Sequence, residues 1–400
     1  MKILWGSPLP PIRSGVSDYA VELLAELGSR AEVRVLEPPQ WSRPEVWPLD
    51  GLVEMVPEGT DPGAGELALL HLGNNPHHLW LARRLAALSR AVVVLHDLVL
   101  HHLLVEMAAA EGNNARLEDQ LRAAHGEPGA ALARARELGI SGRRDPFLFP
   151  ARHALLASAA GVVVHSKHAL AVIERENPGL ACRSVPLAVA DPGTVDRAAA
   201  RAQLGISDGD VVLMHLGFLT PEKGLQKILA GVAGAVAVGV PARLLLVGEG
   251  RGLDELRSAA DAVGIADRVE AVGWLPLDLF AAAPAAADLG VVLRTPSAGE
   301  TSAAALRFMA CGTPAAVGGG AQFLEWPEAA APRLTPGAPA AADLARLLAS
   351  AAAGGAGWER RRNAARATYE AGHRPEHCAA ALLDALSSLP LEPRRSASGS

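Results

Sequence analysis

Cysteine is scarce in this chain of 400 residues, which contains three. Cys182, Cys311 and Cys378 are too far apart in the sequence for the paired spacing of a zinc site, and three cysteines do not make a disulfide framework. Disulfides persist mainly in oxidising compartments, so this pattern favours a reducing one. We therefore expect a cytoplasmic protein.

Long hydrophobic runs are missing as well. The longest uncharged apolar stretch, residues 228–242, is rich in alanine and glycine and is too short and too weakly apolar to span a bilayer. The opening residues MKILWGSPLPP have the character of a strand and a loop, without the hydrophobic core and cleavage site of a signal peptide. The sequence thus predicts no membrane-spanning helix, and a peripheral contact at the inner face of a membrane stays compatible with it.

Lysine is also scarce, and Lys2, Lys167, Lys223 and Lys227 are the lysines of the chain. A compact ammonium group is not interchangeable with the planar guanidinium of arginine, so a retained lysine is informative. The net charge of −6 argues against a surface built for nucleic acid, and we expect no nucleic-acid partner.

What the sequence does contain is a regular alternation of strand-length apolar runs with helical patterns, which favours parallel sheets. The alternation breaks at residues 185–193 and then restarts. We predict an α/β protein with two Rossmann-like doubly wound domains, residues 1–188 and 189–372, facing a cleft that holds the ligand beyond the carboxyl ends of the strands. A C-terminal helix over 373–390 is expected to pack back toward the N-terminal domain, and a disordered tail to follow over 391–400.

The individual elements follow from the same patterns. The predicted strands cover residues 2–5, 32–36, 67–72, 91–95, 161–165, 211–216, 242–247, 269–272, 289–293 and 315–317. The predicted helical regions cover residues 17–27, 78–89, 101–138, 151–159, 166–174, 223–238, 252–263, 276–283, 300–310 and 340–371, with a loop over 143–150.

The loop after the first strand, residues 6–15, ends in Gly15 directly before a helix. A glycine at that place lets the backbone approach a ligand closely and leaves the N–H groups of the helix start available for phosphate. The loop lacks the G-x-G-x-x-G pattern of dinucleotide-binding proteins, and an ordinary strand–helix connection is the alternative interpretation.

Polar side chains follow two further strands of the first half. His96 and Asp97 end a buried strand, and Asn74 and His77 follow the neighbouring one. Because the carboxyl ends of parallel strands line the ligand side of such a sheet, we expect these residues near a substrate. A histidine in an apolar strand is more often a buried structural residue, so that alternative stays open. The histidines lack a metal-binding spacing, and we predict no metal site.

In the second half, the segment GFLTPEKG (residues 217–224) follows a buried strand and places Lys223 at the start of a predicted helix. A cation disfavours a helix N-terminus, so its presence calls for another reason, and neutralising a diphosphate is one. A surface lysine is the alternative. The turn GEGRG (residues 248–252) is a weak glycine-rich signal, which we interpret as a turn lining the cleft.

Residues 294–317, RTPSAGETSAAALRFMACGTPAAV, are the most informative stretch. The sequence GETS (residues 299–302) stands at the mouth of the predicted helix, where free N–H groups and small hydroxyl side chains suit an anion such as a diphosphate. Arg307 lies seven residues after Glu300, two helical turns on, so both are expected on one face. An ordinary capped helix is the alternative.

Taken together, these segments resemble the retaining GT-B glycosyltransferases of family 4 over nearly the whole chain. The resemblance rests on the order and spacing of PP-x-x-x-G-x-x-DY, GNN-x-x-H, HD, G-x-L-x-x-EKG, LLLVGEG, VGWLP, AAADLGVVLR and GETS…MACGTPAAV. It implies a GT-B fold and a metal-independent, hexosyltransferase-type enzyme without a cofactor. Such an enzyme moves a sugar from a nucleotide-diphosphate donor to a glycan, lipid-linked or small-molecule acceptor, as in bacterial polysaccharide biosynthesis.

The same resemblance implies roles for individual residues: Lys223 would neutralise the diphosphate, the turn at 273–275 would meet the base, and His96 would sit near the reacting sugar. The implied catalytic residues are His96, Lys223 and Glu300. The implied donor-binding residues are Gly15, Gly217, Phe218, Lys223, Gly248, Gly273, Trp274, Leu275, Gly299, Glu300, Thr301, Ser302 and Arg307. The implied acceptor-side residues are Asn74, His77 and Asp97.

Two positions depart from the family pattern. The family usually has arginine after the glycine of the EKG segment, where this chain has Phe218, and a ribose-binding glutamate where this chain has Arg307. Aligned through MACG, the first glutamate position of the family falls on Gly299, one residue before Glu300. Arg307 replaces the missing cation in one interpretation, and the donor is bound differently in the other.

These departures keep a second hypothesis open, a catalytically weak sugar-nucleotide-binding or partner protein of the same fold. A nicotinamide-dependent oxidoreductase is a third hypothesis, but it needs a dinucleotide fingerprint after the first strand, which residues 6–15 lack. Turnover of a panel of nucleotide-sugars separates the first two hypotheses.

Overall fold

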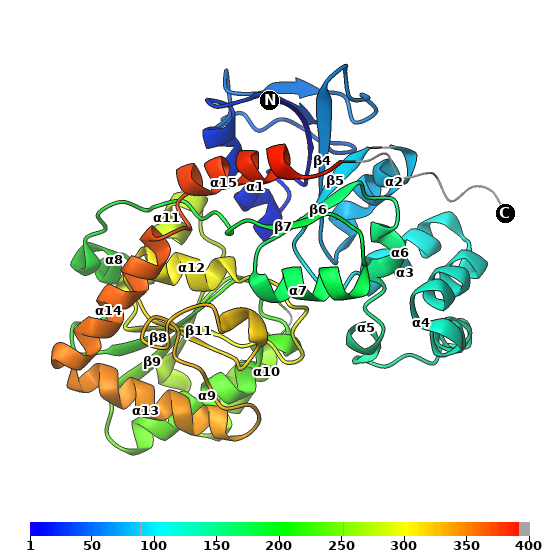
Figure 1. Ribbon diagram of the computed structural model, residues 1–400. Coiled ribbons are helices and arrows are strands. Elements are labelled where there is room, and N and C mark those ends of the chain that lie inside the picture. The colour runs from blue at the N-terminus through cyan, green and yellow to red at the C-terminus, as the bar shows by residue number, and fades with distance from the viewer. Residues whose placement is uncertain (89, 251, 392–400) are drawn as a thin grey trace. The chain divides into compact units, whose positions relative to one another are not determined.

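The structure is a computed structural model that describes residues 1–88, 90–250 and 252–391 (Figure 1). The chain forms two compact units, neither of which is contiguous in sequence. The first unit contains residues 1–188, 298–301 and the C-terminal segment from Pro375, and the second contains residues 189–297 and 302–374. Beyond Leu391, the predicted tail lies outside the described residues.

The first unit is built on a parallel sheet with the strand order β3-β2-β1-β4-β5-β6-β7. Its strands are β1 (Lys2–Gly6), β2 (Glu32–Leu36), β3 (Glu54–Val56), β4 (Glu66–Leu72), β5 (Ala91–Leu95), β6 (Gly161–Val164) and β7 (Cys182–Ser184). The central strands are nearly continuous apolar runs, as expected for a parallel sheet covered on both faces, and β5 is buried along its whole length.

Helices connect these strands, and the last helix of the chain also belongs to this unit. They are α1 (Gly15–Leu27), α2 (Leu79–Ala87), α3 (His101–Glu111), α4 (Asn114–Glu137), α5 (Asp145–Leu148), α6 (Arg152–Leu156), α7 (Lys167–Glu176) and α15 (Pro375–Ser388), with a 3-10 turn at Pro76–His78. The helices α3 to α6 form a long insertion between β5 and β6. Helix α15 packs against α1, as Figure 1 shows, and buries Cys378, Leu382 and Leu386.

The second unit is built on a parallel sheet with the strand order β10-β9-β8-β11-β12. Its strands are β8 (Val211–Leu216), β9 (Ala242–Val247), β10 (Val269–Gly273), β11 (Leu289–Val292) and β12 (Ala315–Val317). Its helices are α8 (Arg197–Gln203), α9 (Leu225–Ala237), α10 (Leu253–Ala262), α11 (Leu277–Ala282), α12 (Ala303–Ala310), α13 (Pro339–Ala353) and α14 (Gly355–Glu370). Short 3-10 turns lie at Pro221–Lys223, Ala266–Arg268, Ala283–Ala286 and Ala321–Phe323.

Small residues allow the helices of the second unit to pack closely. Helix α9 lies against α13, and a Cβ at Gly231 would stand 2.7 Å from the Cβ of Leu344. A larger residue at this place would push the two helices apart, because a packed core does not absorb such an overlap.

The fold class predicted from the sequence is confirmed, because both units are α/β with doubly wound parallel sheets. Five predicted strands agree residue for residue, namely β2, β5, β8, β9 and β12. The strands β3 and β7 and helix α8 were not predicted, and α5 occupies part of the expected loop 143–150. Among the described helices, none is both long enough and apolar enough to cross a bilayer.

Candidate functional site

The connection between β1 and α1 is the first part of the candidate site. Ser14 caps α1, because its hydroxyl oxygen accepts a hydrogen bond from the Val16 N–H at 3.2 Å. The next residue, Gly15, is exposed, and a Cβ built on it would meet no atom within 4 Å. Since the packing of the chain does not require glycine here, close approach of a ligand is a reason for this residue.

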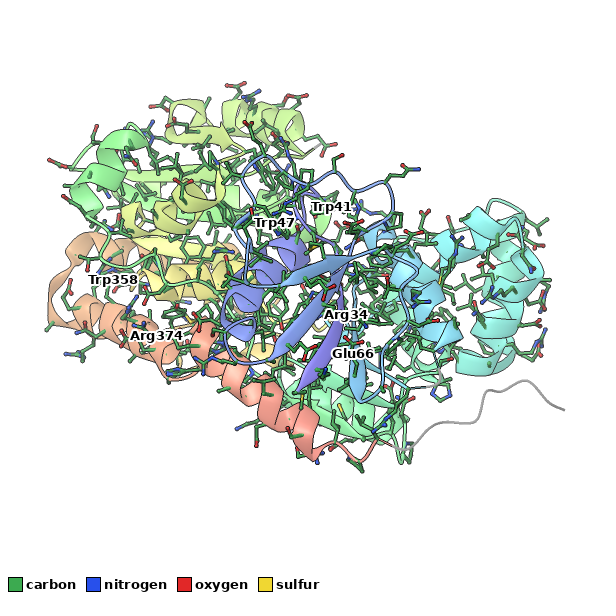
Figure 2. All side chains as sticks on the ribbon, turned by 90° about the horizontal axis from the view of Figure 1, so that it is seen from above. Arg34, Trp41, Trp47, Glu66, Trp358 and Arg374 are labelled. Carbon is green, nitrogen blue, oxygen red and sulfur yellow. The ribbon has the colours of Figure 1, made fainter. Side chains whose placement is uncertain are left out.

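The segment after β2 holds the same connection in place. The indole N–H of Trp41 donates to the carbonyl oxygen of Pro10 at 2.7 Å. The rings of Trp41 and Trp47 meet edge to face with centroids 5.3 Å apart, and Figure 2 shows the two residues on neighbouring parts of that segment. These contacts fix the loop that leads to Gly15.

His96 follows β5 and is half-buried among aromatic rings. Its Nε2 lies 3.0 Å from Nδ1 of the fully buried His71 on β4. The rings of Tyr19 and His165 flank it, with centroid distances of 5.1 and 5.0 Å. Burial, reinforced by His165, lowers the pKa of His96 well below its usual value. The imidazole is therefore neutral at pH 7.

The predicted acceptor-side residues join two loops at this edge of the sheet. The Asn74 N–H donates to Oδ2 of Asp97 at 2.8 Å. The side-chain oxygen of Asn74 accepts from the N–H of His102 at 2.9 Å, at the start of α3. Asn74 and Asp97 thus stabilise the loops after β4 and β5 by hydrogen bonds within the protein. His77 is exposed, and its N–H donates to Oδ1 of Asn75 at 3.0 Å.

Residues 298–301 pack within the first unit, although the sequence placed them in the second domain. The Leu98 N–H donates to the carbonyl oxygen of Ala298 at 2.7 Å. The Thr301 hydroxyl donates to the carbonyl oxygen of His165 at 3.0 Å. Gly299 has φ of +74°, and a Cβ there would lie 2.5 Å from Cδ1 of Leu98. These contacts bring the buried carboxyl of Glu300 into the first unit, together with His96 and Gly15.

The predicted helix over 300–310 is wrong at its start, because α12 begins at Ala303. Ser302 is its N-cap, with its hydroxyl oxygen accepting from the Ala305 N–H at 3.2 Å. Glu300 is not helical, so it does not share a helix face with Arg307 as predicted. Arg307 belongs to the second unit, is only 4% exposed, and places its guanidinium 5.4 Å from the ring centroid of Phe280.

Lys223 ends a 3-10 turn after β8, and α9 begins two residues later than predicted, at Leu225. The lysine therefore precedes the helix and does not lie in its first turn. It is half-buried and acts on His215 of β8, whose pKa falls to about 3 because of burial and then of the nearby positive charges of Lys223 and Arg294.

Arg294 is the residue of this site that sequence reasoning missed. It is half-buried and follows β11, the strand that pairs with β8. The Thr295 N–H donates to the carbonyl oxygen of Glu222 at 2.9 Å, which ties the segment after β11 to the turn that carries Lys223. Both cations therefore emerge at the carboxyl edge of the second sheet. The signal in the sequence was a charged residue directly after a buried strand.

Phe218 and Trp274 form an exposed aromatic pair at the same edge. They are 43% and 40% exposed, and their ring centroids lie 6.1 Å apart. Phe218 follows β8, and Trp274 follows β10, with the half-buried Leu275 next to it. Two large aromatic side chains that stay exposed provide a surface for stacking a planar ligand.

Backbone conformation and close packing explain the glycines at this edge. Gly248 has φ of +139°, its N–H donates to the carbonyl oxygen of Gly273 at 2.8 Å, and a Cβ on it would overlap the carbonyl group of Gly217. The glycine-rich turn after β9 therefore packs directly on the segment after β8. This close contact positions the backbone beside Phe218.

Residues 210–345 match the family described as glycosyl transferases group 1. A D-inositol 3-phosphate glycosyltransferase of Segniliparus rotundus is 38% identical over 143 residues, which are 34% of this chain and 31% of that protein. A 2-deoxystreptamine N-acetyl-D-glucosaminyltransferase of Streptomyces fradiae is 37% identical over 118 residues, 28% of this chain and 27% of that protein. The matches thus span less than a third of either relative's length.

Solved structures resemble the fold over almost the whole chain. HepE of Anabaena, solved in complex with UDP, has a TM-score of 0.65 at 17% identity and covers 97% of this chain and 100% of its own. The sucrose-phosphate synthase of Thermosynechococcus elongatus has a TM-score of 0.65 at 18% identity, covering 97% of this chain and 98% of its own. The chain therefore has the GT-B fold, and over residues 210–345 it is similar in sequence to the group 1 glycosyl transferases.

Proposed function

We propose that this protein is a glycosyltransferase that moves a sugar from a nucleoside diphosphate donor to a hydroxyl of its acceptor. The observation that carries the proposal is the carboxyl edge of the second sheet, where the Thr295 N–H donates to the Glu222 carbonyl oxygen and so joins the segments of Lys223 and Arg294, and where Phe218 and Trp274 expose their rings. Two cations suit a diphosphate, and two exposed rings suit a nucleobase. The similarity of residues 210–345 to group 1 glycosyl transferases supports the same reaction.

The chemistry of the reaction explains why such a site is useful. Breaking the bond between sugar and phosphate leaves a diphosphate anion and a sugar with oxocarbenium character. Fixed cations stabilise the leaving anion without needing to reorganise, and we propose that Lys223 and Arg294 do this without a metal ion. Arg294 then supplies the positive charge that the family pattern has at the position of Phe218, and Phe218 contributes to the base platform.

Three neighbouring residues contribute groups for the sugar in this proposal, namely Glu300 and Thr301 of the first unit and Ser302 of the second. The Thr301 hydroxyl donates its proton to a carbonyl, so its oxygen stays able to accept from a sugar hydroxyl. The Ser302 oxygen accepts from a backbone N–H, so its own proton stays able to donate. Glu300 adds a buried carboxyl for sugar hydroxyls, and transfer proceeds with retention, as the motif resemblance implies.

A turnover assay tests the proposal. The full chain is incubated with UDP-, GDP- and ADP-linked hexoses, with and without EDTA, and nucleotide release is measured. Release from at least one donor, unchanged by EDTA, is expected, and the anomeric proton signal of the product reports retention. Binding without release would favour the catalytically weak sugar-nucleotide-binding protein. If no donor binds or reacts, the proposal fails.

Gly15→Ala provides a test that separates ligand approach from folding. The variant is expected to lower kcat/KM by about tenfold, or ~1.4 kcal/mol, because the added methyl group occupies the space of the donor. The free energy of unfolding should change by less than about 0.5 kcal/mol, because no atom of the chain opposes the new Cβ. Steady-state kinetics and urea unfolding measure both quantities.

Gly59→Ala is the matched control, because it lies in the same unit and a Cβ there also meets no atom within 4 Å. It should leave both turnover and stability unchanged. Equal kinetics of the two alanine variants would show that the donor does not approach Gly15.

We also propose a peripheral contact with an anionic membrane, through the segment formed by the connection between α4 and α5 and by α5 itself (Figure 1). Leu138 and Ile140 in the connection and Leu148 at the end of α5 are 78%, 63% and 68% exposed, which is unusual for large apolar side chains. Residues 134–148 contain four arginines against two acidic residues, whereas the whole chain has a net charge of −6. Apolar side chains surrounded by arginine suit the surface of anionic lipid.

Vesicle sedimentation tests this contact. The full chain should sediment with vesicles of phosphatidylglycerol and much less with phosphatidylcholine. Replacing Leu138, Ile140 and Leu148 together with serine should weaken binding by about tenfold or more, because ~0.8 kcal/mol is lost per buried methylene. Serine at Val238 and Val263 of the second unit, which are 72% and 54% exposed, is the control. If the triple serine variant binds the vesicles as strongly as the wild type, this segment is not the membrane contact.

A further inference from the structure

A cluster of five buried or half-buried rings lies at the carboxyl edge of the first sheet. It contains Trp5, Tyr19, His71, His96 and His165, whose neighbouring ring centroids are 4.0 to 5.7 Å apart. Three of the five are imidazoles, each from the end of a different strand: β4, β5 and β6. Such a cluster is more than a hydrophobic core, because each imidazole has to place its proton on one of two nitrogens.

The backbone settles that choice for two histidines around the pair of His71 and His96. Nδ1 of His165 lies 3.0 Å from the carbonyl oxygen of Val185, and Nδ1 of His78 lies 2.9 Å from the carbonyl oxygen of His71. A carbonyl oxygen only accepts, so both imidazoles carry a proton on Nδ1. The tautomers of His165 and His78 are therefore fixed by the backbone.

Between His71 and His96 a single proton occupies the 3.0 Å contact of Nδ1 with Nε2. If His96 donated it, the neutral His71 would carry its own proton on Nε2. That atom is fully buried, and within the described part of the chain it has no hydrogen-bond partner. A buried N–H without an acceptor costs about 1–3 kcal/mol and is the rarer defect in native structures. If His71 donates instead, its Nε2 carries no proton, so no buried N–H of His71 lacks an acceptor.

We propose that His71 is a positioning residue that donates from Nδ1 to His96 and thereby fixes His96 with its proton on Nδ1. His96 then offers a ligand a neutral N–H donor at the nitrogen that does not face His71. In the proposed glycosyltransferase, on which this last step rests, the partner is an oxygen of the sugar. A neutral donor supports a hydroxyl oxygen without adding a positive charge next to a developing oxocarbenium ion.

The surroundings of the pair keep it neutral. Burial lowers the pKa of both His71 and His96 well below the usual value, and the neighbouring His165 and His78 act in the same direction. Tyr19, which also faces the pair, has its pKa raised by burial and stays protonated. Asp97, bound to the Asn74 N–H, is the charged group on the loop after β5.

The experiment is a long-range proton–nitrogen correlation spectrum of the full chain labelled with nitrogen-15 in histidine. The signals of His71 and His96 are assigned by their loss in His71→Asn and His96→Asn. Both imidazoles are expected to carry the proton on Nδ1 at pH 7. A spectrum in which His96 carries its proton on Nε2 overturns the proposal. The spectrum reports the tautomers without an activity assay. It can therefore confirm or overturn the role of His71 even if the protein is not a glycosyltransferase.

Two substitutions of His71 test the positioning role. His71→Asn places an amide N–H near the former Nδ1, so His96 should keep its tautomer and kcat/KM should stay near the wild-type value. His71→Leu removes the donor, so the tautomers of His96 should mix and kcat/KM should fall by about 10–100-fold, as for other lost orienting partners. His101→Asn, at another buried histidine whose Nδ1 meets the Phe149 carbonyl, is the control.

If His71→Leu does not fold, the wild-type spectrum and the His71→Asn variant still decide the matter. An unchanged His96 tautomer in a folded His71→Leu protein would overturn the role of His71. A loss in the leucine variant that the asparagine variant does not rescue would point to packing alone, and would also overturn it.

Discussion

Lys223→Ala is expected to lower kcat/KM for donor turnover by about 10²–10³-fold, the usual effect of removing one preorganised group that stabilises a developing anion. Lys223 is held by the 3-10 turn after β8, and the carbonyl oxygen of Glu222 accepts from the Thr295 N–H at 2.9 Å, beside Arg294. The leaving diphosphate would then lose one of its two fixed cations. Arg294→Gln is expected to cause a loss of similar size. Steady-state kinetics with the best donor of the panel measure both.

Lys227→Ala is the matched control for this prediction. Lys227 lies one turn further along, inside α9, and belongs to the same unit. This variant should keep the wild-type kcat/KM for donor turnover. Should Lys223→Ala retain wild-type kinetics while nucleotide still binds, the diphosphate does not lie at this edge of the second sheet.

Arg201→Met is expected to destabilise the protein by about 3–5 kcal/mol, because it removes a buried guanidinium that serves several carbonyl oxygens, each of which costs about 1–3 kcal/mol when left without a donor. The guanidinium of Arg201 is buried, donates to the carbonyl oxygens of Ser207 and Asp210 at 2.6 and 2.7 Å, and lies 3.5 Å from Asp288. Methionine fills the volume but leaves these acceptors without their donor. Urea-induced unfolding of the full chain, followed by circular dichroism, measures the change.

Arg257→Met is the control for the stability prediction. Arg257 is exposed on α10 and pairs with Asp254 at 3.8 Å, so its loss should cost less than about 1 kcal/mol. A similar unfolding midpoint for the two variants would show that the buried arginine contributes no more than a surface ion pair does.

The contrast between well-predicted and missed elements has a local explanation. Strands such as β5 and β9 can be recognised locally, because β5 is a continuous apolar run and β9 has one interruption, as expected for strands buried on both faces. Helix α8, with the sequence RAAARAQ, has no apolar stripe to reveal it. It is stabilised by Arg197 and Arg201, which reach Asp288 far along the chain. No local window of sequence contains such a contact.

The candidate site divides in the same way. The ends of buried strands pointed to His96 and Lys223, because in a parallel sheet these ends share one edge. The helix start at Glu300 was placed too early, since the GETS sequence has the composition of a helix mouth. The packing of Gly299 on Leu98, some 200 residues away in sequence, keeps residues 298–301 out of the helix. Arg294 was missed because its relation to Lys223 depends on the pairing of β11 with β8.

The discontinuous first unit has a consequence for how the chain is made. Residues 1–188 contain its whole sheet, but α15, which packs against α1, and residues 298–301, which bind the Leu98 N–H, come later in the chain. On the ribosome, the second unit is complete in sequence before α15 has been synthesised. The part of the protein that begins first is therefore finished last, and until then α1 keeps an apolar face exposed to chaperones and proteases.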